Sequence, residues 1–310
     1  MCLAKDAFIY YHTKMLNRRS FRTMATSAFN RGRFIKPIYK DYCFSSILPA
    51  IEEILTKGVS THLPTGVFDK DLGRYKNVVL FLVDGFGWQM FERAYKRSSL
   101  LKQIARCGIV SQLTAPFPSA TAAAVTSLHT GEPVGIHGIY EWFYYEPRVD
   151  AVISPLIFSF AGDKVRNTLQ KAGVSPEAIL PLRTVYERLK KKGVQSSVYV
   201  SQEYSPSPYS DVLMRGAEVN FYKTVAEGLT ELLVSLSEKK KPSYSFFYFD
   251  KVDSLAHKYG HASLYCEAEI DAFFFNLGHS FLSKQKKKND TLILITADHG
   301  QIDIDPTKTF

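Results

Sequence analysis

Carboxylates and histidines stand directly after three apolar, strand-like runs of the chain. The three groups are Asp84-Gly85, Asp298-His299-Gly300, and Asp253 with His257. In open α/β sheets the ligand crevice lies at the carboxyl ends of the strands, so these groups are expected to meet at one edge. Carboxylate and imidazole are ligands that suit zinc or manganese. Together the three groups could hold two divalent cations.

Each group also has a plainer interpretation when it is taken alone. Asp-Gly after a strand is a common turn, and Asp298 could cap a polar turn. Asp253 and His257 are four residues apart, so they lie on one face of a helix, where they could pair with each other. Asp250, Asp303 and His261 are nearby alternative ligands. The coincidence of three groups after three strands favours the metal site.

A fourth element adds a hydroxyl group. The segment Pro116–Gly131 runs from a proline turn into helix-forming alanines that follow Thr121. This predicts that Thr121 lies at a helix N-terminus, where free amides and the helix dipole favour an anion. The hydroxyl could be an N-cap and nothing more. Beside two metals it could instead ionise and attack phosphorus.

The elements that must position these groups alternate between strand-like and helix-like segments, which predicts an α/β fold. The strands are expected at Asn77–Val83, Ile109–Leu113, Gln195–Val200, Ser243–Phe249 and Thr291–Thr296. The chain has 310 residues, 45% of them hydrophobic and 22% charged, which excludes global disorder. It has no apolar run of transmembrane length. The four cysteines show no CxxC spacing, so a disulfide framework is not expected.

Much of the net charge of +9 lies at the N-terminus. Residues 1–33 contain seven basic residues and one acidic residue, which resembles a transit peptide or an untranslated leader before Met24. We expect this extension to be disordered and the catalytic domain to span residues 34–310. The extension lacks the apolar core of a secretory signal, which favours a cytoplasmic protein.

Three lysine clusters precede predicted strands, at 190–192, 239–241 and 284–288. Lysines at helix ends complement the helix dipole, so we interpret the clusters as solvated helix termini. The minority interpretation is a basic module that binds polyanions. No basic stripe on one folded face is evident, so we expect no specific nucleic-acid partner.

The motifs occur in an order that resembles the type I phosphodiesterase/nucleotide pyrophosphatase family of the alkaline phosphatase superfamily, closest to its bacterial members. The match covers roughly Phe34–Phe310. It implies a three-layer sandwich, a mostly parallel sheet with helices on both faces, and two zinc ions. Asp84, Asp298, His299 and the oxygen of Thr121 would hold one metal, and Asp253 and His257 the other. Thr121, ten residues before Gly131, matches the nucleophile that accepts a phosphoryl or nucleotidyl group from a small phosphate ester or nucleotide.

Two positions depart from the family pattern. Eukaryotic members carry an asparagine three residues after the nucleophile, where this chain has Ala124. The family also supplies one more histidine to the second metal, well downstream of Asp-His-Gly, whereas this chain stops eleven residues after His299. We therefore expect a truncated frame or fragment, and the alternative function is an impaired relative. His261, His129 and His137 are possible substitutes. Thr121 argues against a sulfatase, and the aromatic stretch Ile139–Tyr145 could stack on a substrate or form core and lid packing.

Overall fold

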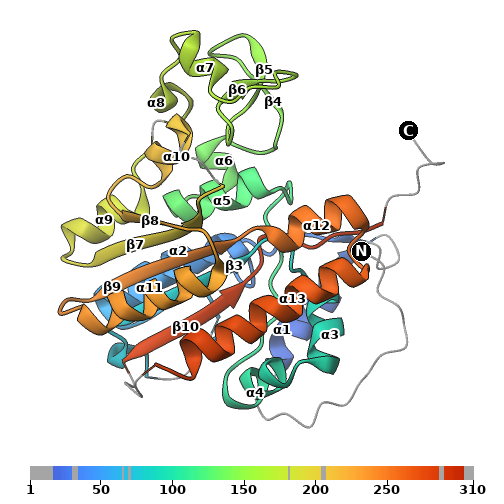
Figure 1. Cartoon of the computed structure of the whole chain (residues 1–310), viewed down its shortest axis with the longest axis vertical. Coiled ribbons are helices and arrows are strands. Elements are labelled where there is room, and N and C mark those ends of the chain that lie inside the picture. Colours follow the sequence, from blue (N-terminus) through green and yellow to red (C-terminus); the bar gives the residue numbers. More distant parts are fainter. Residues whose placement is uncertain are drawn as a thin grey trace.

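The computed structural model describes residues 17–29, 34–64, 66–68, 71–180, 182–203, 207–285 and 290–303. Its centre is a five-stranded sheet in the order β10-β3-β9-β7-β8 (Figure 1). All four neighbouring pairs of strands are parallel. The strands are β3 (Asn77–Val83), β7 (Gln195–Ser201), β8 (Glu218–Tyr222), β9 (Ser243–Phe249) and β10 (Thr291–Thr296).

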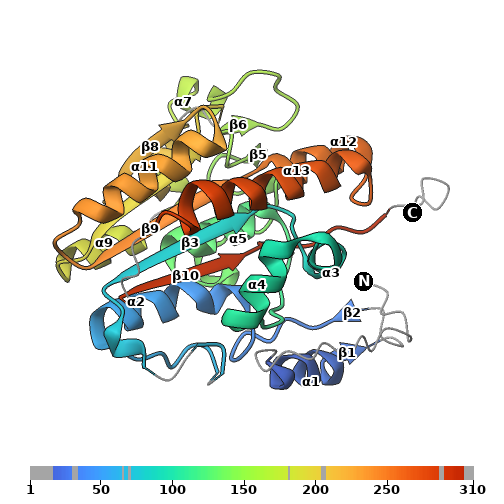
Figure 2. The same ribbon diagram turned by 60° about the horizontal axis from the view of Figure 1, so that its bottom comes forward.

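Helices cover both faces of this sheet, which confirms the predicted three-layer α/β sandwich (Figure 2). One face packs against α2 (Ile47–Lys57), α5 (Thr121–Thr130) and α9 (Val185–Lys191). The other packs against α3 (Trp88–Arg97), α4 (Ser99–Cys107), α11 (Val225–Glu238), α12 (Lys251–Tyr259), α13 (Leu264–Asn276) and the π-helical segment Leu277–Leu282. Every residue of β9 is buried, as expected for a central parallel strand.

A small antiparallel sheet lies beyond α5 and α6 at one end of the molecule (Figure 1). Its strands are β4 (Tyr144–Glu146), β5 (Ala151–Ser154) and β6 (Ser159–Phe160). The helices around it are α6 (Val134–His137), α7 (Thr168–Lys171), α8 (Pro176–Ile179) and α10 (Pro208–Leu213). Ala122 joins the separate apolar core of this region, so the small sheet packs against the start of α5.

Secondary structure begins at a lower residue number than the sequence suggested. Residues 17–29 contain α1 (Arg18–Thr26) and β1 (Ala28–Phe29), and β1 pairs with β2 (Phe34–Ile35). Met24 is buried on α1, because the helix lies against the body of the protein. The expected disorder is therefore wrong for 17–29. Residues 1–16 and 30–33 lie outside the described residues.

One predicted strand is also wrong. The segment 109–113 is extended but does not join the central sheet. Its backbone groups are used by the N-terminal region instead: the amide of Asn17 donates to the carbonyl of Val110, and the amide of Gln112 donates to the hydroxyl of Ser20. The next residue, Thr114, forms a single parallel bridge with Cys43. The structure also adds β8, which the sequence did not predict.

Short 3-10 helices at Phe44–Ser46 and Leu72–Arg74 complete the described elements. The first lysine cluster lies in the last turn and at the C-cap of α9, and the second follows the end of α11, as predicted. Residues 286–288 of the third lie outside the described residues. No helix in the described part of the chain combines the length and the apolar character needed to cross a membrane.

Candidate metal and phosphate site

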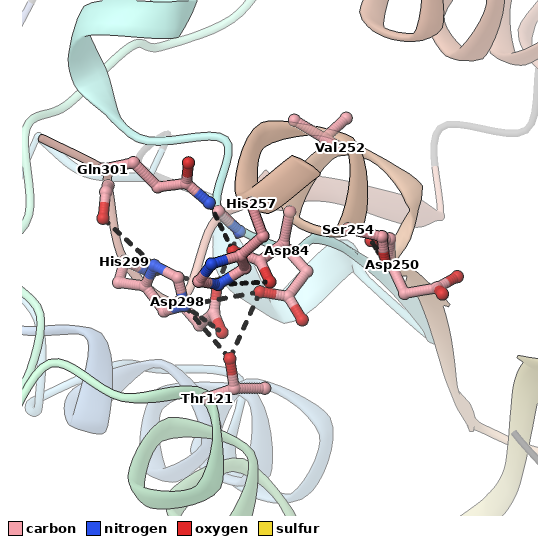
Figure 3. Close-up of polar contacts among 12 residues, drawn as sticks. Asp84, Thr121, Asp250, Val252, Ser254, His257, Asp298, His299 and Gln301 are labelled. Carbon is pink, nitrogen blue, oxygen red and sulfur yellow. Dashed lines mark hydrogen bonds and ion pairs between the residues drawn. The ribbon is translucent and has the colours of Figure 1, made fainter. Parts of the chain in front are cut away.

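The site forms at the carboxyl ends of β3 and β10, which are neighbours in the sheet (Figure 3). Asp84 follows β3 and is 2% exposed, and Asp298 follows β10 and is 1% exposed. One ligand atom from each of Asp84, Asp298 and His299 can be chosen so that all three lie within 4.8 Å of one another. The structure thus brings together the first predicted set of ligands.

Thr121 approaches this cluster from the other side, at the first turn of α5 (Figure 3). Its Oγ1 lies 3.0 Å from Nε2 of His299 and 3.5 Å from Oδ1 of Asp84. Ala120, not Thr121, occupies the N-cap position, and the Thr121 side chain does not cap the helix. The hydroxyl is therefore free to face the carboxylates and the helix N-terminus, where backbone amides lack partners within the helix.

His299 has a defined orientation. Its Nδ1 lies 3.1 Å from the carbonyl oxygen of Gly300, to which Nδ1 donates. Nε2 points into the cluster, 3.5 Å from Oδ1 of Asp84 and 3.5 Å from Oδ2 of Asp298. A backbone acceptor that fixes the ring of a ligating histidine is the usual arrangement in metal sites.

The buried carboxylates fit a divalent cation. Oδ1 of Asp298 accepts from the amides of Gly85 and His299, but its Oδ2 is buried without a hydrogen-bond partner in the described structure. Burial raises the pKa of Asp84 well above its ordinary value, and the negative charges of Asp298 and Asp253 raise it further. Two buried acids with an unpartnered oxygen are costly without a counter-charge, which a cation supplies.

The second predicted pair lies next to this cluster on α12, with Asp253 in the first turn of the helix and His257 in the last. Oδ2 of Asp253 lies 3.4 Å from Nε2 of His257, whose side chain is 76% exposed. A Cβ on Gly85 would lie 2.9 Å from Oδ1 of Asp253, so this carboxylate touches the turn that carries Asp84. Asp253 and His257 are placed to hold a second cation, on the more open side of the site.

The alternative ligands named from the sequence have other partners. Oδ2 of Asp250 lies 3.4 Å from Nζ of Lys251, and Figure 3 shows its carboxylate directed away from Thr121. Nε2 of His261 lies 3.3 Å from Oδ1 of Asp303.

Two further histidines are buried elsewhere. Nδ1 of His129 lies 2.8 Å from the hydroxyl of Tyr186, and Nε2 of His137 lies 2.9 Å from the hydroxyl of Ser127. Burial lowers their pKa values to about 3 and about 4, so both are neutral at pH 7. Neither histidine substitutes for the family's additional ligand in this arrangement.

Two residues of the site were missed from the sequence. The hydroxyl of Tyr248 donates to Oδ2 of Asp84, and the side-chain amide of Gln301 donates to Oδ1 of Asp253. Tyr248 shares its face of β9 with Tyr244 and Phe246, so it appeared to be an ordinary core residue. Its place one residue before the end of the strand was the available signal.

Gly87 and Gly300 lie where the loops after β3 and β10 touch. A Cβ on Gly87 would lie 2.3 Å from Cα of Gly300 and 3.0 Å from its amide nitrogen. Real Cβ atoms do not approach backbone this closely. The contact explains why the loop after β3 carries no side chain at position 87, and it keeps His299 close to the turn after β3.

Ala124 and the aromatic stretch have clear positions. Ala124 is fully buried against the sheet, so it takes no part in the site. Ile139 and Tyr144 belong to the core of the small sheet, whereas Phe143 and Tyr145 are about half exposed. The stretch therefore combines core packing with an exposed aromatic surface.

Comparisons with known proteins show what the chain resembles. Among solved structures, murine ectonucleotide pyrophosphatase/phosphodiesterase 5, as an inactive variant in complex with AMP, superimposes with a TM-score of 0.57 at 18% identity. The alignment covers 74% of this chain and 58% of that chain. The human protein gives 0.54 at 20% identity, covering 72% and 56%. Phosphonoacetate hydrolase from Sinorhizobium meliloti 1021, in complex with phosphonoacetate, gives 0.50 at 17%, covering 72% and 55%.

These likenesses establish the alkaline-phosphatase-like fold, and the chain spans less than two thirds of each of these structures. No individual curated protein matches the chain. A family model described as type I phosphodiesterase/nucleotide pyrophosphatase matches residues 78–310, which is most of the chain and includes all six predicted site residues. The chain therefore belongs to the type I phosphodiesterase/nucleotide pyrophosphatase family.

Proposed function

We propose that this protein is a metal-dependent hydrolase of phosphodiester or nucleotide pyrophosphate bonds that works through a covalent intermediate on Thr121. The observation that carries the proposal is the position of the Thr121 hydroxyl, 3.0 Å from Nε2 of His299 and 3.5 Å from Oδ1 of Asp84. Family membership supports the reaction class. The murine relative bound to AMP supports a nucleotide as one class of substrate.

Each residue has a role in this proposal. Asp84, Asp298 and His299, with Oγ1 of Thr121, would hold one divalent cation, and Asp253 and His257 the other; zinc suits these donors. Bound cations would lower the pKa of the hydroxyl and neutralise charge on the phosphate. Tyr248 orients Asp84, and Gln301 orients Asp253.

The reaction takes place in two displacements at phosphorus. Oγ1 of Thr121 loses its proton to solvent and bonds to phosphorus while the bond to the leaving oxygen breaks. The leaving oxygen takes up a proton from solvent, and phosphorus stays on Thr121 with its second ester group. Water then attacks this phosphorus, the bond between Oγ1 and phosphorus breaks, and the threonine regains a proton. The amides at the N-terminus of α5 point toward the same place and favour the negative charge of the phosphoryl group.

The test is hydrolysis of an aryl phosphodiester by the zinc-loaded protein. Thr121→Ala is expected to lower kcat by roughly 10³-fold or more, and Thr121→Ser to retain measurable turnover because it keeps a hydroxyl. The inactive murine variant also carries alanine in place of a threonine. Undiminished hydrolysis by Thr121→Ala would reject the proposal.

A second candidate is a relative that binds one metal without turnover. It is favoured by the exposure of His257, since Asp253 and His257 supply only two side chains to the more open position. Zinc content separates the two candidates: two tightly bound ions per chain reject the second, whereas one ion and no hydrolysis support it.

A further inference from the structure

Two of the three lysine clusters meet at a cavity that the metal site does not use. The cavity has a volume of about 570 Å³ and lies at the amino ends of β7 and β8. The metal site lies at the other end of the strands, where their carboxyl ends meet. Lys190 comes from the end of α9, and Lys239 and Lys241 come from the loop between α11 and β9. The volume is in the range of small-molecule sites.

Lys239 is the most deeply placed of these cations. Its side chain is only 12% exposed. Its Nζ lies 3.3 Å from the hydroxyl of Ser197 and 3.9 Å from Oε2 of Glu218, a glutamate whose side chain is 67% exposed. A long contact with an exposed carboxylate compensates a buried ammonium poorly. Lys239 thus retains positive charge that a further anion in the cavity can neutralise.

The charge of the lining defines the ligand. Lys190, Lys239 and Lys241 oppose the single carboxylate Glu218, which gives a net charge of +2. Ammonium groups bind phosphate as point charges. We propose that this cavity is a second anion site, which binds a phosphate-bearing small molecule at the amino ends of the strands, opposite the hydrolytic site. This proposal does not depend on the hydrolytic activity.

The test is calorimetric titration of the full chain with inorganic pyrophosphate at 150 mM salt, after metal has been removed by chelation and dialysis. Without metal the hydrolytic site presents mainly carboxylates, which repel this probe. We expect saturable binding with one site per chain. Lys239→Gln and Lys241→Gln should each weaken it at least about tenfold.

The chain offers closely matched controls. Lys191 and Lys240 are exposed neighbours in the same two clusters but do not line the cavity. Lys191→Gln and Lys240→Gln should leave the affinity within twofold. Equal losses in all four lysine variants would show diffuse attraction and overturn the proposal, as would the absence of saturable binding to the wild type.

Two further comparisons keep the result clear. Lys241 is exposed, so Lys241→Gln remains a valid test if Lys239→Gln unfolds the chain. Citrate, which carries carboxylates only, should bind at least about tenfold more weakly than pyrophosphate. Equal affinity for citrate would overturn the assignment to phosphate.

Discussion

The hydroxyl of Thr121 lies 3.0 Å from Nε2 of His299, although 178 residues separate them in the chain. The contact joins the start of α5 to the end of β10, so it depends on the packing of a helix onto one face of the sheet. It places the proposed nucleophile beside the proposed metal ligands, which include two buried carboxylates. The predictions below concern the residues that maintain this arrangement.

Tyr248 is expected to control metal affinity without touching the metal. Tyr248→Phe removes the hydroxyl that donates to Oδ2 of Asp84, so this carboxylate loses its orienting contact. Such changes typically cost 10–100-fold in metal affinity or activity, and we expect a loss in the range of about 10–100-fold in zinc affinity. Competition with a zinc-binding dye measures it. Tyr244→Phe, on the same face of β9 at its other end, should leave the affinity unchanged.

Gly87 is expected to tolerate no side chain. In Gly87→Ala the new Cβ would press on the backbone of Gly300 and displace His299. Overpacking of this kind costs about 1–3 kcal/mol, and zinc affinity should fall as well. Gly135→Ala is the control, since a Cβ there meets nothing within 4 Å. Urea unfolding and zinc titration of both variants would contradict this account if the two behaved alike.

Asp298 is expected to lower the stability of the metal-free protein and to raise its affinity for metal. In Asp298→Asn the remaining carbonyl oxygen can still accept from the amides of Gly85 and His299, but the charge that helps to raise the pKa of Asp84 is gone. The metal-free variant should therefore melt at the same temperature as the metal-free wild type or higher. Its zinc affinity should fall by about 100-fold or more. A lower melting temperature of the metal-free variant would contradict this account, because it would show that the charge of Asp298 does not destabilise the metal-free protein.

The sequence was sufficient to predict that Asp84, Asp298 and His299 lie together, because each one follows an apolar strand. The apolar runs of β3 and β10 were enough to predict both strands. Because the two strands pair in parallel, Asp84 and Asp298 lie together at their carboxyl ends. Tyr248 and Gln301 could not be found in this way, because their roles depend on which face of a strand or loop meets a carboxylate. The strand expected at 109–113 failed for a similar reason: an apolar run does not reveal that the N-terminal region takes its backbone hydrogen bonds.

Glu53 should make part of the stability depend on pH. Burial alone would raise its pKa, but the amide and hydroxyl of Thr61 and the ring of His62 lower it to about 2. A carboxyl with a lowered pKa stabilises the fold above its unfolded value, which is near 4.5, and this contribution is lost as pH falls toward 2. Glu53→Gln should lower the melting temperature by roughly 2–4 °C at pH 7, and the difference should shrink toward pH 2.5.

The exposed Glu92 on α3 provides the control for this experiment. Glu92→Gln should leave the melting temperature unchanged at both pH values. If the effect of Glu53→Gln were the same at pH 7 and pH 2.5, it would come from packing and not from the carboxylate charge.

The account depends most directly on a covalent bond between Thr121 and phosphorus. The zinc-loaded protein should be mixed with excess aryl phosphodiester, quenched in acid within the first turnover, digested, and examined by mass spectrometry. We predict a peptide in which Thr121 carries the retained half of the diester, that is, phosphorus with its remaining ester group. This adduct should be absent from Thr121→Ala and should lie on the serine in Thr121→Ser. Hydrolysis that proceeds with no modified peptide, at an equal rate in Thr121→Ala, would contradict the account.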